Sequence, residues 1–252
     1  DLEPVVSLIV PASDLRVTAN AEISITGEAR DDLGLQATEL VYEIPPAVSA
    51  TETATTPLKL EQHSIPLGPP QPGNLEQTIE TIWKLSDLNL PAGTQVRFWL
   101  QARDACDLHG MNGQIGRSAV RVLSILTPEE KQQEFSGQQN QIAERINQLR
   151  DKQATLEQST REIIEQWKSI GSLRPAEIHE LENLQTKQKE LSHELGQGSN
   201  SVLGELKALQ QARTTNQLNE PQSSELLTRW ESTLAPLVEE VLPAVLTKLD
   251  AT

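Results

Sequence analysis

"RVLSILTPEEKQQEF", residues 121–135, is the stretch that decides the fold, because the spacing of the apolar residues changes within it. Its first six residues end a region, up to about residue 126, in which the apolar pattern has period two, as in β-strands with one buried face. From Phe135 onward the apolar side chains recur every three or four residues, as along one face of an α-helix. The stretch therefore predicts separate β and α domains that cover residues 1–126 and 127–252.

Upstream of this border, short alternating stretches are separated by turn residues. The clearest is "VRFWLQA", residues 96–102, where Val96, Phe98 and Leu100 point to one side and Arg97 and Trp99 to the other. Seven such stretches within about 125 residues predict a seven-stranded immunoglobulin-like sandwich. The expected strands are 5–10, 22–29, 38–44, 58–65, 78–85, 96–103 and 119–126.

Two proline-rich runs flank the fourth expected strand. They are "PPAVSATETATTP", residues 45–57, and "PLGPPQPGN", residues 66–74. Because proline has no backbone N–H to donate into a ladder, it is largely confined to sheet edges. The fourth strand is therefore expected at an edge.

Downstream of the border, Thr127 is a good N-cap, Pro128 suits the first helical turn, and Glu129 and Glu130 complement the helix dipole. An apolar seam then continues for five heptads, which predicts a coiled-coil helix of roughly forty residues. Its polar positions, Gln139, Gln153 and Thr160, either specify the partner helix or are merely tolerated. The seam consists of Phe135, Gln139, Ile142, Ile146, Leu149, Gln153, Leu156, Thr160, Ile163, Trp167 and Ile170.

Two further helices are expected, from Pro175 and from Pro221. "GQGSNS", residues 196–201, should interrupt the second helix, and Pro236 and Pro243 should bend or segment the third. Each has one apolar stripe, so the simplest arrangement is an antiparallel three-helix bundle. The alternative is a seam left exposed for a second chain. The third stripe comprises Leu226, Leu227, Trp230, Leu234, Leu237, Val241, Val245 and Leu249.

Two similar acidic motifs follow the second and sixth strands, "EARDDLGLQA" at 28–37 and "QARDACDLHG" at 101–110. In an immunoglobulin-like topology both strands end at the same end of the sandwich, where the first strand also enters. Asp31, Asp32, Asp104 and Asp107 would then gather and could bind Ca²⁺, which takes six to eight oxygen ligands. The alternative is that these carboxylates accept hydrogen bonds from turn amides, since no calcium-loop spacing is present.

Charge and composition exclude several function classes. The net charge is −15, with 8 basic and 16 acidic residues in the first half and 13 and 20 in the second. Both halves would be repelled by phosphate backbones, so nucleic-acid binding is not expected. No apolar run reaches the ~18 residues of a membrane span, so this segment is not expected to insert into a membrane.

Enzymatic chemistry is also disfavoured. Only one cysteine, Cys106, is present, and no phosphate-binding loop or dinucleotide fingerprint occurs. Aromatic residues make up 3 % of the chain, too few to line a sugar-binding cleft around paired carboxylates. A hydrolase using Asp31, Asp32 or Asp104 is the least favoured alternative. No catalytic residue and no cofactor other than Ca²⁺ is therefore predicted.

Three stretches carry a resemblance to a known group of proteins: "ITGEARDDLGLQATELVYEI", "IWKLSDLNLPAGTQVRFWLQARDACDLHGMNGQIGRS" and "LTPEEKQQEFSGQQNQIAERINQLRDKQ". They resemble the extracytoplasmic region of large, uncharacterised bacterial cell-envelope membrane proteins, which combine an immunoglobulin-like domain with long helices. The second motif departs from that pattern by inserting "LHGMNGQI" before Gly116.

The resemblance implies a periplasmic location, with a membrane anchor outside this segment, and no known reaction. The expected function is a non-enzymatic structural or protein-interaction module that binds a protein partner or self-associates through its helices. The alternative is a Ca²⁺-dependent module that binds a glycan or peptide at the Asp-rich end of the sandwich.

Overall fold

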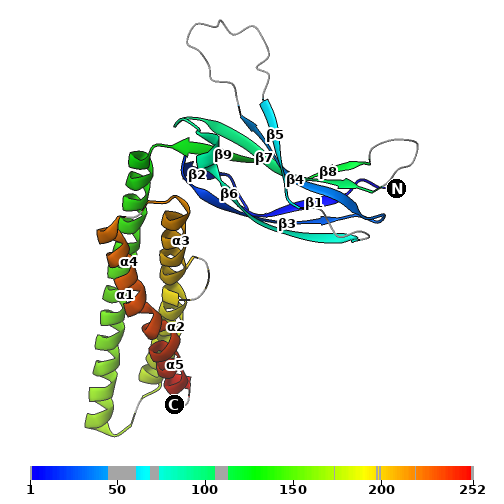
Figure 1. The fold of residues 1–252 in the computed structure, drawn as a ribbon. Coiled ribbons are helices and arrows are strands. Elements are labelled where there is room, and N and C mark those ends of the chain that lie inside the picture. Colours follow the sequence, from blue (N-terminus) through cyan, green and yellow to red (C-terminus); the bar gives the residue numbers. More distant parts are fainter. Residues whose placement is uncertain are drawn as a thin grey trace, which may run out of the picture. The chain divides into compact units, whose positions relative to one another are not determined.

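The computed structural model of the chain describes residues 2–44, 61–68, 74–105, 113–172, 174–196, 198, 200–218 and 220–250. It divides into two compact units, residues 1–131 with 215–217, and residues 132–214 with 218–252. The first unit is built of β-strands and the second of helices (Figure 1). The fold is therefore α+β with separate domains, as the change of apolar period at residue 127 predicts.

The described residues of the first unit form nine strands in two sheets. One sheet has the order β1 (Val5–Val10), β3 (Glu22–Arg30), β6 (Glu76–Lys84). The other has the order β2 (Leu15–Thr18), β9 (Arg121–Leu126), β7 (Gln95–Asp104), β4 (Leu35–Ile44), β5 (Glu61–Pro66), and β8 (Ile115–Arg117) pairs with β7. A short 3-10 helix, η1 (Leu85–Leu88), follows β6. All of these pairs are antiparallel except β2 with β9.

The seven expected strands are present as β1, β3, β4, β5, β6, β7 and β9, but the predicted number of strands was wrong. The additional strands, β2 and β8, have only four and three residues, too few to show an alternation in the sequence. β5 lies at an edge of its sheet, as its proline-rich flanks predict. Most of those flanks, residues 45–60 and 69–73, lies outside the described residues.

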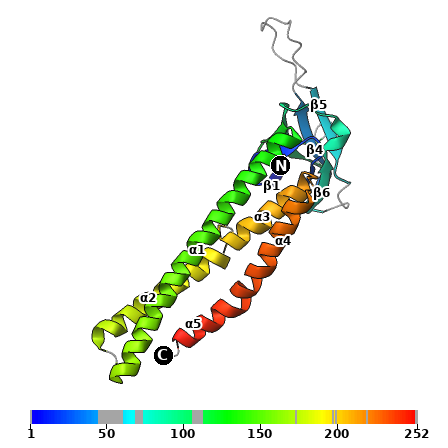
Figure 2. The ribbon, with the colours of Figure 1, turned by 90° about the vertical axis from the view of Figure 1, so that its left-hand side faces the viewer.

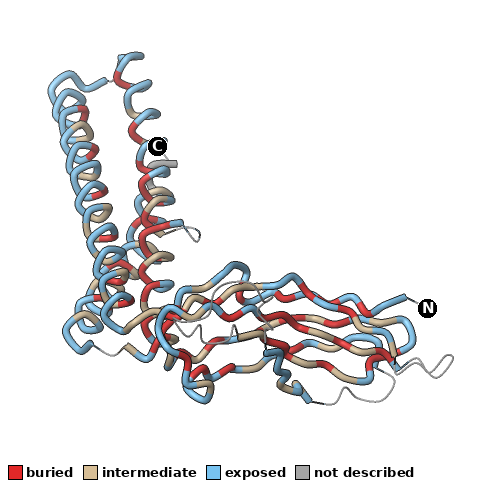
Figure 3. The backbone as a smooth tube through the Cα atoms, turned by 90° about the horizontal axis from the view of Figure 1, so that it is seen from above, coloured by how far each residue is buried: buried red, intermediate tan, exposed pale blue. Residues whose placement is uncertain are grey.

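The two sheets pack around one apolar core, to which both contribute the inward-facing residues of their strands. In Figure 3 buried and exposed positions alternate along the strands. The sheets approach closely at Gly27 of β3, where a Cβ atom would overlap the side chain of Leu100 in β7. Residues 215–217 complete this unit: the Asn216 side chain accepts a hydrogen bond of 2.8 Å from the backbone N–H of Thr18.

The second unit contains α1 (Pro128–Ile170), α2 (Pro175–Gly196), α3 (Val202–Thr215), α4 (Pro221–Pro236), a π-helical segment η3 (Leu237–Val241) and α5 (Leu242–Asp250). α2 and α3 run back along α1, and α4 to α5 run in the direction of α1 (Figures 1 and 2). The expected interruption separates α2 from α3, and the expected irregularity follows Pro236. Because proline cannot donate a helical hydrogen bond, the backbone adjusts at this point.

The two longest helices begin with reciprocal caps. At α1 the Glu130 carboxylate accepts a bond of 2.9 Å from the Thr127 backbone N–H, and Thr127 Oγ1 accepts one of 3.1 Å from Glu130 N–H. This capping box confirms the predicted start at Thr127. At α2 the Glu177 carboxylate accepts bonds from the side chain and the backbone N–H of Arg174, and these bonds lower the pKa of Glu177.

Candidate functional site

The strongest candidate site is a groove in the helical unit, between α1 and the segment from α4 to α5. η3 and α5 pack against α2. A cavity of about 550 Å³ is lined by residues of α1, of α2 and of the segment from α4 to α5. Its lining includes Ile146 and Leu149 from α1, Leu191 and Leu195 from α2, and Leu237, Val241 and Val245 from η3 and α5.

Two smaller cavities extend this space along the helices. One of about 230 Å³ shares Gln153, Glu157, Gln188 and Val245 with the first. Another of about 350 Å³ shares Ile146 and Leu234 with it, and adds four residues of α4: Leu226, Arg229, Trp230 and Thr233. Together the three cavities form one elongated depression, here termed the helical groove.

One wall of the helical groove is an apolar stripe that the unit leaves open. Leu237, Val241 and Val245 are 39, 47 and 38 % exposed, and their spacing of four places them on one helical face. The simplest arrangement predicted from the sequence would bury these three residues in the third stripe, and that burial is not found; the alternative, an exposed seam, describes this part of the stripe better. Leu234 of the same stripe and the neighbouring Leu242 are buried in the core of the helical unit.

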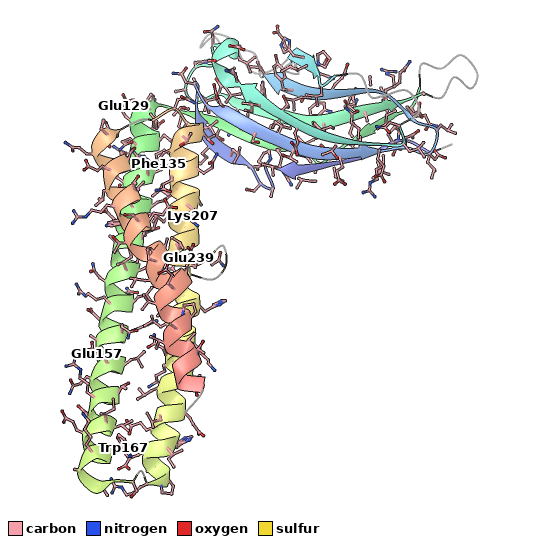
Figure 4. All side chains as sticks on the ribbon, turned by 60° about the horizontal axis from the view of Figure 1, so that its bottom comes forward. Glu129, Phe135, Glu157, Trp167, Lys207 and Glu239 are labelled. Atoms are coloured by element: carbon pink, nitrogen blue, oxygen red, sulfur yellow. The ribbon has the colours of Figure 1, made fainter. Side chains whose placement is uncertain are left out.

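The seam of α1 is buried at every seventh residue: Phe135, Ile142, Leu149, Leu156 and Ile163. Two of its predicted members, Trp167 and Ile170, are exposed instead. They lie near the end of the hairpin that α1 forms with α2, where Figure 4 labels Trp167. Ile164 of α1 and Ile178 of α2 are exposed as well.

A polar pair crosses the apolar lining of the groove. Gln188 of α2 is buried, and its Nε2 donates a hydrogen bond of 3.1 Å to Oε1 of Gln153 in α1. Of the polar seam positions, Thr160 donates instead to its own helix, at Leu156 O. The sequence identified Gln153 but not its partner. The spacing of Gln188 from Leu184 and Leu191 was the available signal.

The charge at the groove differs from that of the whole chain. The chain has 36 acidic and 21 basic residues, yet the charged residues that line the three cavities are Arg150, Arg161, Arg229 and one glutamate, Glu157. Arg161 forms an ion pair with Glu157, and Arg150 forms one of 2.9 Å with Asp151. The lining is therefore apolar, and Arg229 is the arginine at its margin for which no ion pair is present among the described residues.

The structure brings the two acidic motifs of the sandwich to the same end. β3 and β7 lie in different sheets, and the backbone N–H of Ala105 donates a hydrogen bond of 2.8 Å to Gly34 O. β1 enters at this end, because Val5 pairs with Arg30. Asp31 and Asp104 therefore belong to one end of the sandwich, as predicted; Asp32 is exposed there, and Asp107 lies outside the described residues.

Both of the better-placed carboxylates bind turn amides. Asp31 Oδ2 accepts a bond of 2.9 Å from Leu33 N–H, and the buried Asp104 Oδ1 accepts one of 2.8 Å from Gln114 N–H. Among the described residues, no group of three or more His, Cys, Asp or Glu could hold a metal ion. A Ca²⁺ site formed by Asp31, Asp32, Asp104 and Asp107 stays a prediction, since Asp107 is not described.

Comparisons with known proteins do not place the chain in a family. No family model matches the sequence, and no curated protein matches it. Among solved structures, the sporulation control protein Spo0M from Bacillus subtilis is similar over 58 % of this chain and 56 % of its own, at 13 % identity and a TM-score of 0.33. OgpA from Akkermansia muciniphila is similar over 50 % of this chain and 31 % of its own, at 14 % identity and a TM-score of 0.29.

The apo form of the Calx CBD1 domain is matched over its whole length and over 50 % of this chain, at 15 % identity and a TM-score of 0.21. The chain thus spans about half or less of the length of the first two structures. At these TM-scores the likenesses carry no argument about function. Within the described residues, no helix combines the length and the apolar character that crossing a membrane requires.

Proposed function

We propose that this chain is a non-enzymatic protein-interaction module of a bacterial cell-envelope protein, and that its helical unit carries the binding surface. The observation that supports this proposal is the open apolar wall of the helical groove. Leu237, Val241 and Val245 remain more than one third exposed although Leu234 and Leu242 beside them are buried. Contiguous apolar surface of this kind marks interaction sites on folded proteins.

The shape of the groove favours a helix as its ligand. From Leu226 to Val245 the groove follows about 30 Å of helix, at 1.5 Å per residue. α1, α2 and the α4 to α5 segment supply its lining, so an added helix would complete a four-helix arrangement with a coiled-coil-like seam. Laying the apolar face of an amphipathic helix into such a groove is a recurring mode of protein recognition.

In this proposal the sandwich is an immunoglobulin-like structural domain at the periplasmic side of the membrane. Support for the location comes from the resemblance of residues 20–150 to bacterial cell-envelope proteins. Support for a structural role comes from Asp31 and Asp104, whose carboxylates accept hydrogen bonds from Leu33 and Gln114 in the loops that join the strands.

The binding surface is tested by photo-cross-linking in the source cells. A benzophenone amino acid replaces Val241 in the groove or, as the control, Gln158 on the exposed surface of α1, which lines none of the three cavities. We expect a discrete protein adduct from position 241 and none from position 158. Absence of any protein adduct at 241 would overturn the proposed interaction function.

Location is tested separately with Gln158→Cys in a Cys106→Ser background. A membrane-impermeant maleimide should label this thiol after the outer membrane alone is permeabilised. Labelling only after lysis of the inner membrane would contradict a periplasmic location.

A further inference from the structure

We infer that the occupant of the helical groove is a second copy of this chain, which packs antiparallel through α4, η3 and α5. This inference rests on the proposed function, and it names the partner of the same surface. Two properties of that segment support the inference. Its apolar face lines the groove of its own chain and could also fill the groove of another copy. Its exposed charges are complementary when two copies of the segment pair.

The apolar face satisfies the requirement of a two-fold interface. In such an interface both copies contribute the same patch, so the patch has to be complementary to itself. Leu237, Val241 and Val245 line the groove and also project from it as exposed apolar side chains. Leu226, 36 % exposed, continues this surface at the far end of α4. Each copy therefore offers an apolar helix and an apolar groove beside it.

The charges fix the direction and the register. Arg229 and Glu240 are both exposed and lie eleven residues apart, about three helical turns. Within the described part of the chain, no ion pair of 4.0 Å or less includes either side chain. An antiparallel pairing centred between Leu234 and Ala235 places Arg229 of each copy opposite Glu240 of the other, so that two ion pairs form. A parallel pairing in register would place like charges together.

The choice of a second copy over an unrelated protein follows from this match. Of the arginines at the margin of the groove, Arg150 and Arg161 already pair with Asp151 and Glu157, which leaves Arg229. The chain's own η3 carries the acidic pair Glu239 and Glu240 beside its apolar face. Figure 4 labels Glu239 on this segment. An amphipathic helix with acidic flanks is the complementary ligand, and α4 to α5 of another copy provides it.

Sedimentation equilibrium of the whole chain tests the inference. The chain has a mass of 27.8 kDa, so we expect a species of 2 × 27.8 = 55.6 kDa that dissociates on dilution. Val241→Glu should raise the dissociation constant about 100-fold, because it places a charge in the apolar contact. Gln158→Glu, outside the groove, should leave the constant unchanged.

A charge reversal tests the register without disturbing the apolar face. Arg229→Glu and Glu240→Arg, made singly, should each raise the dissociation constant about tenfold, and the double variant should restore it. Circular dichroism verifies that each variant keeps its helix content. A monomer at about 100 µM, a level at which a specific micromolar dimer would form, would overturn the inference. A dimer insensitive to Val241→Glu, or failure of the double variant to restore affinity, would overturn it as well.

The two proposals fail in distinguishable ways. If the purified chain is a monomer while position 241 still cross-links to a different protein in cells, the second-copy inference is wrong and the interaction function stands. If the chain is a monomer and position 241 gives no protein adduct, both are wrong.

Discussion

The two units of this chain enclose their apolar side chains differently. In the sandwich, two sheets cover one core, and Phe98, Leu100 and Leu123 have no exposed surface. In the helical unit the core is closed toward α2 and α3, while the wall at Leu237 and Val241 stays open. Burial of apolar area is the main source of folding stability. The closed sandwich core therefore contributes to stability, and the side of the helical core that folding leaves uncovered is the surface for which we propose a binding role.

Buried polar groups join separate chain segments in both units. In the sandwich Ser118 Oγ accepts a bond of 2.9 Å from Leu100 N–H, and Thr38 in β4 bonds Gln77 of the other sheet. In the helical unit they join separate helices, as Gln153 and Gln188 do. The buried guanidinium of Arg213 in α3 lies 5.6 Å from the ring centroid of Phe135 in α1. In the helical unit such polar contacts favour the helix register in which these residues meet.

The largest effect is expected in the closed core. Phe98→Ala should lower the free energy of unfolding of the sandwich by about 3–5 kcal/mol, because it leaves a cavity between the sheets. Trp83 reports this transition, since its ring lies 5.5 Å from that of Phe98. Urea unfolding followed by tryptophan fluorescence is the measurement, with the exposed Ile82→Ala as the control. A loss equal to that of Ile82→Ala would show that the sandwich core is not closed as described.

Truncation to alanine should lower the free energy of unfolding more in the buried floor of the helical groove than on its open wall. Leu191→Ala, in the buried floor, should lower the stability of the helical unit by about 2–4 kcal/mol. Val241→Ala, on the open wall, should cost less than about 1 kcal/mol under conditions where the chain is monomeric. Urea unfolding followed by far-ultraviolet circular dichroism measures both. Equal losses would mean that the groove is closed by the chain itself.

A smaller effect is expected at the Asp-bearing end of the sandwich. Asp104→Ala should cost about 1–3 kcal/mol, because the partly buried hydrogen bond from Gln114 N–H to the Asp104 carboxylate is lost. Millimolar Ca²⁺ should leave the melting temperature of the unaltered chain unchanged, since Asp31 and Asp104 already bind turn amides. Differential scanning calorimetry measures both. A Ca²⁺-dependent rise that disappears in Asp31→Asn would establish the metal site instead.

Substitutions at Gln153 and Gln188 should change the free energy of unfolding of the helical unit by about 1 kcal/mol. The sign of this change depends on whether one or both residues are replaced. Gln188→Leu alone should destabilise the helical unit, because Gln153 Oε1 loses its donor. Gln153→Leu together with Gln188→Leu should recover or exceed the original stability while weakening the helix register. Unfolding experiments measure the first effect and sedimentation the second. Additive losses in the double variant would show that the pair has no coupling.

The strands and helices were predictable because each repeats a period long enough to recognise. The alternation at Ile23 and Ile25, or the heptads from Phe135 to Ile163, is set by local geometry. β2 and β8 were missed because they pair through backbone hydrogen bonds over too few residues to impose a pattern. The common end of Asp31 and Asp104 followed from topology, and bonds from turn amides were one of the two interpretations that the sequence offered. The particular donors, Leu33 and Gln114, depend on loop geometry that the sequence does not encode as a spacing.

The groove could not be predicted for a different reason. A stripe such as Leu237, Val241 and Val245 shows that a helical face is apolar, and it does not show what covers that face. The answer depends on the irregularity at η3 and on how closely α5 approaches α1 and α2. These are tertiary properties. The pairing of Gln153 with Gln188 is also tertiary, because it requires the register between α1 and α2.

The smallest expected effect concerns the start of α2, and it depends on pH. Bonds from the Arg174 side chain and backbone lower the pKa of Glu177, so the folded state binds the proton more weakly than the unfolded chain. The stabilisation is therefore complete above the ordinary glutamate pKa of about 4.3 and is lost as the pH falls through the lowered value. The melting temperature of the helical unit should differ between the unaltered chain and Glu177→Gln at neutral pH and converge in acid. Glu180→Gln, at an exposed position of the same helix, should show no such pH dependence. A difference that persists unchanged in acid would show that the cap does not depend on the charge of Glu177.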